Sequence, residues 1–308
     1  MTSRQNNSAT SRTSGSTRRK KITSAATLLP LALGIAANTG GHTATTARAG
    51  RTEPTRSIIF QPTCANPDFP SETPTAMDGE SCGLSGSGGA ETNQNKAKNN
   101  FCATDPAGEL ANPTLTSIPE LVALQTKAQQ IPDINFGSRF AHPLTSKPGP
   151  VVDRDPLEAL GEGKLVQLIG YVKIARQEGK ESVNCGANVP DDPAYHDIHV
   201  SIVLSPADQE CSGVVVEMTP HHRPEAWTAA LVNEVEAAGL LVRVTGQRMF
   251  DSSHTSCQNG TPIHGDPSRI SLWEVHPIYK FEVCPQGNCT SGGWVALEAW
   301  KGGGENVE

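Results

Sequence analysis

The sequence lacks the short patterns that mark several common classes of active site. It contains no C-x-x-C pair, which argues against a cysteine-type zinc site or a thiol redox site. It contains no G-x-x-x-x-G-K-[ST] loop to bind phosphates. The serine–glycine tract at 85–89 has no strand–turn–helix context, so it does not indicate a serine nucleophile. Aromatic residues are also scarce, at 5% of the chain. The sequence therefore names no catalytic residue of these classes.

Basic residues are few once the first 49 positions are set aside. Those positions hold seven of the 25 Lys and Arg residues and no acid, which leaves 18 basic against 32 acidic side chains. Proteins that bind nucleic acids need a basic surface to neutralise phosphates. The charge balance therefore argues against a nucleic acid as the partner and favours a protein, a glycan, another small ligand or a cation.

Residues 1–49 are typical of an export signal. A basic stretch at Arg18–Lys21 precedes an apolar run from Ile22 to Ala37, and Ala47–Ala49 provides a small-x-small cleavage site. The run contains Pro30 and Gly34 and is shorter than a membrane-spanning helix needs. The basic stretch also resembles a twin-arginine signal, although the usual hydrophobic pair after the arginines is missing. No later segment is long and apolar enough to span a bilayer, so we expect a secreted or periplasmic protein.

The cysteine count predicts disulfides in such an exported chain. An even number of cysteines in an oxidising compartment indicates up to four bridges. Three cysteines precede residue 110 and five follow residue 180, so complete pairing requires at least one bridge between the two regions. The cysteines are Cys64, Cys82, Cys102, Cys185, Cys211, Cys257, Cys284 and Cys289.

Composition and periodicity divide the chain into five parts. Residues 93–102 within the second part are dense in polar side chains and are interpreted as a solvated loop, with a short helix as the alternative. Residues 117–130 predict a helix that Ser117 can cap. The five parts are a signal peptide (1–49), an irregular cysteine-containing segment (50–115), a helix and linker (116–159), a β-barrel (160–289) and a flexible tail (290–308).

The fourth part has the clearest pattern. Alternating apolar and polar residues predict strands at 164–175, 196–204, 212–219, 240–250 and 271–283, and helical spacing predicts a helix at 224–238. This β-β-β-α-β-β order resembles the OB-fold, a five-stranded barrel with a helix between its third and fourth strands. The resemblance covers residues 160–284, and Gly170 fits the sharp bend that such barrels need. We expect a mainly β protein built on this barrel.

A second resemblance concerns two tracts of the barrel. Residues 242–251 (VRVTGQRMFD) and 271–277 (SLWEVHP) are similar to those of uncharacterised exported bacterial OB-like proteins. That similarity implies an export location and a fold, and it implies no chemistry.

Two carboxylate–imidazole pairs are the candidate site. Asp197 and His199 lie two apart on one predicted strand, and Glu274 and His276 lie two apart on another, so each pair points to one side. Strands 2, 3 and 5 of an OB-like barrel are neighbours. We therefore expect both pairs to meet Glu217, from strand 3, on the outer face of the barrel.

This patch has two interpretations that the sequence leaves open. Imidazole and carboxylate groups suit zinc, manganese or a similar divalent ion, which can activate water for hydrolysis. Alternatively, the five side chains are ordinary exposed polar positions of half-buried strands. Five further residues stand where they can extend the patch toward a rim of the barrel: His221, His222, Arg223, Asp251 and His254.

Three functions therefore remain in view. The first is an exported binding module with an unknown ligand. The second is a metal-dependent hydrolase that uses the patch; its nuclease variant is weakened by the nine basic and 16 acidic residues of 160–289. The third is a structural protein of the cell envelope.

Overall fold

The structure is a computed structural model of the chain, and all the residues it describes belong to the unit Thr52–Glu308. The predicted signal at 1–49 lies outside the described residues. None of the described helices has the length and apolar character needed to cross a bilayer. The described residues are 86, 92–100, 103–109, 111–131, 154–179, 181, 183, 196–220, 223–263, 267–290 and 292–302.

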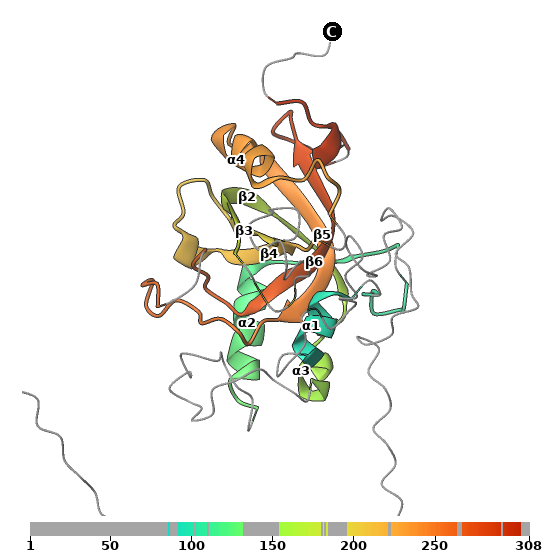
Figure 1. Cartoon of the computed structure of the whole chain (residues 1–308), viewed down its shortest axis with the longest axis vertical. Helices are drawn as coiled ribbons and strands as arrows, with labels where there is room; N and C mark the ends of the chain where they lie inside the picture. Colours follow the sequence, from blue (N-terminus) through green and yellow to red (C-terminus); the bar gives the residue numbers. More distant parts are fainter. Residues whose placement is uncertain are drawn as a thin grey trace, which may run out of the picture. The chain divides into compact units, whose positions relative to one another are not determined.

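Five strands close into a barrel, as the sequence predicts (Figure 1). They follow the order β2–β3–β4–β6–β5, and β5 pairs back onto β2. Neighbouring strands are antiparallel except β4 and β6, which are parallel at Val216 and Val275. The protein is thus mainly β, with the OB-like β-β-β-α-β-β order. The strands are β2 (Leu165–Gln177), β3 (Ile198–Val203), β4 (Val214–Met218), β5 (Leu241–Phe250) and β6 (Trp273–Cys284).

Helix α4 (Ala229–Ala237) connects β4 to β5 and packs on β2. It begins five residues later than predicted, because the Oγ atom of Thr228 accepts a hydrogen bond from the backbone N–H of Leu231 and caps the helix. The Asn233 side chain bonds to both backbone groups of Ala175. These contacts fix the helix across the end of the barrel that lies away from α1 (Figure 1).

Alternating side chains of the five strands fill the interior. Ile198, Val200 and Ile202 of β3 are buried in one apolar cluster with Val216 of β4 and Trp273 of β6. The neighbouring residues on each strand necessarily point to the outer face. The core and the candidate site therefore lie on opposite faces of the same strands.

The barrel wall requires glycine where β2 crosses β3. A Cβ atom on Gly170 would lie 2.6 Å from both Cγ2 of Ile202 and the carbonyl oxygen of Val203. No larger side chain fits at that distance without moving β3. The bend predicted at Gly170 thus reflects close packing of two backbones.

Short elements precede the barrel. Strand β1 (Thr114–Thr116) pairs in parallel with β2, and α3 is Asp155–Ala159. Helix α2 (Ile118–Ala128) begins after Ser117, whose side chain accepts a hydrogen bond from the Glu120 N–H, as predicted. Its Gln125 side chain accepts a hydrogen bond from the Leu272 N–H, which fixes the segment before β6.

Helix α1 (Thr92–Lys98) corrects one prediction. The interpretation of residues 93–102 as a solvated loop is wrong for 93–98, where the alternative, a short helix, is confirmed, and the side chains of Gln94, Asn95 and Ala97 are buried. The helix is fixed by partners that lie about 150 residues further along the chain, which no local pattern reveals.

The expected flexible tail also differs from the structure at residues 292–302. Strand β7 (Val295–Ala296) pairs with β6, and it is followed by the 3-10 turn η6 (Leu297–Ala299). Leu297 and Trp300 are buried in the main apolar cluster. This segment is therefore part of the barrel's packing.

Four of the eight cysteines form disulfides within the described residues. Cys211 is bonded to Cys257, and Cys284 is bonded to Cys289. Cys64, Cys82, Cys102 and Cys185 lie outside the described residues. If these four also pair, Cys185 must join one of the three N-terminal cysteines, so the bridge between the two regions stays a prediction.

Candidate metal centre

The strand register brings the two carboxylate–imidazole pairs together at Glu217. His199 of β3 lies directly opposite Glu217 of β4. On the other side, Val216 of β4 is aligned with Val275 of β6, which places Glu274 and His276 beside Glu217. The structure thus gathers all five residues from three adjoining strands, as closure of the barrel predicts.

The expected exposure of this patch is wrong. Each of the five residues has a relative exposure of 0%. They do occupy the face opposite the apolar core, but α1 and the segment after β5 cover that face. The alternative in which they are ordinary exposed polar positions is therefore contradicted.

Helix α1 is held on this face by polar and apolar contacts (Figure 1). Gln247 of β5 donates hydrogen bonds from Nε2 to the carbonyl oxygens of Ala97 and His276, each at 2.7 Å. Ala97 packs against Met249. Gln94 donates a hydrogen bond from Nε2 to Oδ1 of Asp251 at 3.0 Å. The helix is therefore tied to the strands that carry the candidate ligands.

Four charged or titratable side chains enlarge the cluster. Asp251 and His254, predicted as extensions, both join it: Oδ2 of Asp251 lies 3.4 Å from Nε2 of His254. Lys98 and Arg269 were missed by sequence reasoning. The Lys98 Nζ atom lies 2.8 Å from Oδ2 of Asp251, and NH1 of Arg269 lies 2.9 Å from Oε2 of Glu274. Only the density of polar residues around Lys98 could have drawn attention to it.

His276 occupies the centre of the cluster. Its Nδ1 atom lies 2.6 Å from Oε2 of Glu217 and 3.3 Å from Oε1 of Glu274. Its Nε2 atom is buried and has no hydrogen-bond partner among the described residues. In the neutral imidazole that a metal ligand requires, the two carboxylates thus favour the tautomer with the proton on Nδ1, which leaves the lone pair on Nε2.

Asp197 belongs to the same group of possible ligands and has no hydrogen-bond partner among the described residues. Both of its carboxylate oxygens are buried, and neither forms a hydrogen bond with any described residue. One ligand atom each from Asp197, Glu217 and His276 lies within 4.8 Å of the others. Buried polar atoms nearly always have a partner, so this arrangement requires an explanation.

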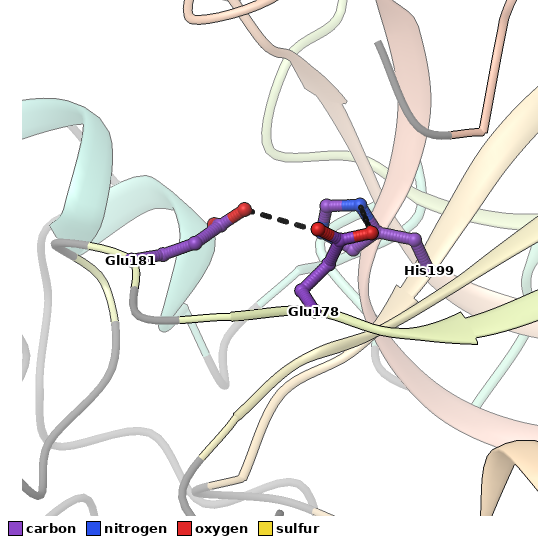
Figure 2. A group of neighbouring side chains, drawn as sticks. All are labelled: Glu178, Glu181 and His199. Carbon is purple, nitrogen blue, oxygen red and sulfur yellow. Dashed lines mark ion pairs between the residues drawn. The ribbon is translucent and has the colours of Figure 1, made fainter. Parts of the chain in front are cut away.

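A second set of possible ligands lies at the partly exposed side of the cluster. Figure 2 shows Glu178, from the end of β2, and Glu181 directed at the imidazole of His199. Nδ1 of His199 lies 3.3 Å from Glu178, and Nε2 lies 3.7 Å from Glu181. The two glutamate side chains retain 21% and 23% of their exposure, so this is where the cluster meets solvent.

Negative charge exceeds positive charge in the cluster. Six carboxylates, including the partly exposed Glu178 and Glu181, surround Lys98 and Arg269. Burial, together with the neighbouring Glu181 and Glu217 carboxylates, raises the pKa of Asp197 to about 7. Burial and Glu217 likewise raise the pKa of Glu274 to about 7. Without a further cation, these acids are held partly protonated near neutral pH.

The charged form of the imidazoles is favoured, unlike that of the two acids. Burial opposes their charge, but the Glu217 carboxylate outweighs it and raises the pKa of His199 to about 10 and that of His276 to about 9. Burial also works against the ionised form of Glu217, yet His199 and His276 hold its pKa well below the ordinary range. Glu217 is thus the permanently negative centre of the cluster.

The remaining predicted extensions do not add to the centre. His221 and His222 lie outside the described residues. Arg223 donates hydrogen bonds from NH1 to the carbonyl oxygens of His196 and Met218, and its charge also acts on Asp197. It is therefore a neighbour of the cluster that supports the backbone around β3.

The donor set fits a divalent metal. Asp197, Glu217 and His276 offer two carboxylates and one imidazole, and three protein ligands with an open position are typical of reactive zinc sites. The carboxylate bonded to the far nitrogen of His276 is the outer partner that such ligands use. A bound dication would also neutralise the excess carboxylates.

No protein-family model, curated protein or solved structure matches this chain. The chemistry of the centre rests on its own residues.

Proposed function

We propose that the protein is an exported metal-binding barrel that holds one divalent cation between Asp197, Glu217 and His276. The observation that carries this proposal is the set of buried atoms that form no hydrogen bond with any described residue: both oxygens of Asp197 and Nε2 of His276. One ligand atom from each of Asp197, Glu217 and His276 lies within 4.8 Å of the others. A single ion at their centre satisfies all of them at once.

Electrostatics supports the same proposal. Burying an ionised carboxylate without a cation is costly. The neutral form is then favoured, and the pKa of the buried acid rises. Asp197 and Glu274 behave in this way, with pKa values of about 7. A dication restores the ionised state that carboxylate ligands need. Mixed oxygen and nitrogen donors suit zinc or manganese.

The export part of the proposal comes from the sequence and is compatible with the disulfides. Cys211–Cys257 and Cys284–Cys289 are bonded, and disulfides persist in oxidising compartments. The signal-like composition of residues 1–49 supports the same location. A secreted or periplasmic compartment also gives access to environmental zinc and manganese.

The metal content of the purified protein tests this function. The protein is expressed with zinc and with manganese, dialysed, and measured by plasma mass spectrometry. We expect about one ion per chain, and thermal unfolding at a higher temperature with metal than with chelator. Glu217→Gln should lose the ion, whereas Glu282→Gln, a matched change on β6 outside the cluster, should keep it. The proposal would be contradicted if the wild type contained no ion and its unfolding temperature did not change when zinc or manganese was added.

Metal-dependent hydrolysis is the second candidate, favoured by one observation. His199 contacts Glu178 and Glu181, which lie at the solvent-facing side of the cluster and can accept a proton from water. A metal-loaded protein that hydrolyses p-nitrophenyl acetate or bis-p-nitrophenyl phosphate, and loses this activity in His199→Ala but not in Glu282→Gln, would support it. Metal bound without such activity would leave a binding module.

A further inference from the structure

A second group of metal-ligand atoms in the cluster already holds a cation. Glu217, Asp251 and His254 offer one ligand atom each within 4.8 Å of one another. The Lys98 ammonium lies among them, 2.8 Å from Oδ2 of Asp251 and 4.0 Å from Oε2 of Glu217. Its side chain is 4% exposed.

Carboxylates surround the ammonium. Its Nζ atom lies 2.8 Å from Asp251, 4.0 Å from Glu217 and 3.9 Å from Glu181. Helix α1 fixes the position, because Gln94 bonds to Asp251 and the carbonyl of Ala97 accepts from Gln247. Lys98 is therefore a permanent positive charge brought to this position by a helix that is tied to the barrel.

The surroundings of Asp251 resemble those of an oriented metal ligand. Its Oδ1 atom accepts hydrogen bonds from Nε2 of Gln94 at 3.0 Å and from the Ser253 N–H at 2.7 Å. Its Oδ2 atom is left to face Lys98 and Nε2 of His254. Carboxylate ligands are commonly oriented in this way by hydrogen bonds to the far oxygen.

We propose that Glu217, Asp251 and His254 form a second divalent-cation site that the Lys98 ammonium fills in the native protein. Lys98 thereby sets the metal stoichiometry: one ion at Asp197, Glu217 and His276, and an ammonium in place of the second. The second site rests on the proposed function only through Glu217, which both groups share. Replacing Lys98 by methionine, which is neutral and one atom shorter, removes the ammonium and leaves the three ligands in place.

The test compares metal stoichiometry in wild type, Lys98→Met and Lys98→Met/Asp251→Asn. The proteins are stripped with chelator and titrated with zinc by calorimetry, and bound zinc is then counted by mass spectrometry. We expect one ion in wild type, two in Lys98→Met and one in the double variant, which has the formal charge of the wild type. Lys96→Met, on the same helix, should bind one ion.

The outcomes separate the two proposals. One ion in both wild type and Lys98→Met overturns the second site and leaves the proposed function standing. No ion in wild type with one in Lys98→Met supports the second site and overturns the proposed function. No ion in either protein overturns both.

The unfolding temperature provides a second measurement in case Lys98→Met is too unstable for titration. Lys98→Met leaves Asp251 and Glu217 without their cation, so its unfolding temperature in chelator should fall below that of the wild type. Zinc should then raise it by more than it raises that of the wild type, since the variant gains two ions. The second site is contradicted if zinc does not refold Lys98→Met and does not raise its unfolding temperature by more than it raises that of the wild type.

Discussion

The Nδ1 atom of His276 lies 2.6 Å from Oε2 of Glu217, and both side chains are fully buried. This contact crosses from β6 to β4, which is the pair of strands that closes the barrel in parallel. Asp197, whose carboxylate forms no hydrogen bond with any described residue, offers a ligand atom within 4.8 Å of one from each of these two side chains. Closure of the barrel thus also assembles the candidate metal centre.

Asp197→Asn should separate metal binding from folding. The amide removes a buried charge and a metal ligand but keeps the shape of the side chain. We expect loss of the ion and, in chelator at pH 8, a free energy of unfolding higher by about 1–3 kcal/mol, because burying the ionised carboxylate carries a desolvation cost that burying the neutral amide does not. Urea denaturation measures the difference. The control Asp208→Asn changes a carboxylate that accepts a hydrogen bond from Ser205, and it should bring no such gain; lower stability of Asp197→Asn in chelator would contradict the account.

The metal-free protein should lose stability as pH rises. Asp197 and Glu274 titrate at about 7 when folded, against 3.8 and 4.5 otherwise, so the folded state binds more protons between these values. Their contribution to stability is fully present below about pH 4, and it is lost as the pH rises through about 7. His276, raised from 6.5 to about 9, extends the loss to that pH.

Urea denaturation in chelator at pH 5 and pH 8 checks this prediction. The free energy of unfolding should be lower at pH 8 than at pH 5. Zinc affinity should rise over the same range, because its ligands must be deprotonated. Zinc should therefore reduce or reverse the difference between the two pH values. A chelated protein that is more stable at pH 8 than at pH 5 would show that the buried acids are compensated in some other way.

Gly170→Ala should strain the barrel. The added methyl group meets Ile202 and Val203 at 2.6 Å, and overpacking of this kind costs about 1–3 kcal/mol. Gly179→Ala is the matched control, since a Cβ there meets nothing within 4 Å. Equal stability of the two variants by thermal unfolding would mean that β2 and β3 do not approach each other this closely.

The two disulfides should differ in their contributions. Cys211–Cys257 spans 46 residues and Cys284–Cys289 spans 5, so loop entropy predicts losses of about 4 and about 2 kcal/mol when each pair is replaced by alanine. Cys257 also belongs to the segment that carries Asp251 and His254. Removing the longer bridge should therefore weaken zinc binding in Lys98→Met, whereas removing the shorter one should not. Urea denaturation and calorimetry measure these effects, and equal losses would contradict them.

The sequence predicted the barrel well because its information is local and repeated. Each strand alternates, and the inward set, such as Val200 and Trp273, has only one face on which to be buried. The same alternation placed His199 and Glu274 together on the other face. Strand order then sufficed to bring the other four candidate ligands to Glu217.

Burial of the site was beyond local reasoning. The cover is α1, a polar helix whose apolar contact is one alanine against Met249 and whose polar bonds reach Gln247 and Asp251. The local sequence pattern predicts that such side chains are exposed to solvent, because their partners lie some 150 residues away in the chain. For the same reason Lys98 gave no signal beyond the density of polar residues around it.

Anomalous diffraction from crystals grown with zinc is the most direct test of the central claim. The account predicts one strong peak about 2 Å from Nε2 of His276 and from carboxylate oxygens of Asp197 and Glu217. Crystals of Glu217→Gln should lack this peak. A wild-type map with no peak among these three side chains, or with zinc bound only elsewhere, would contradict the account.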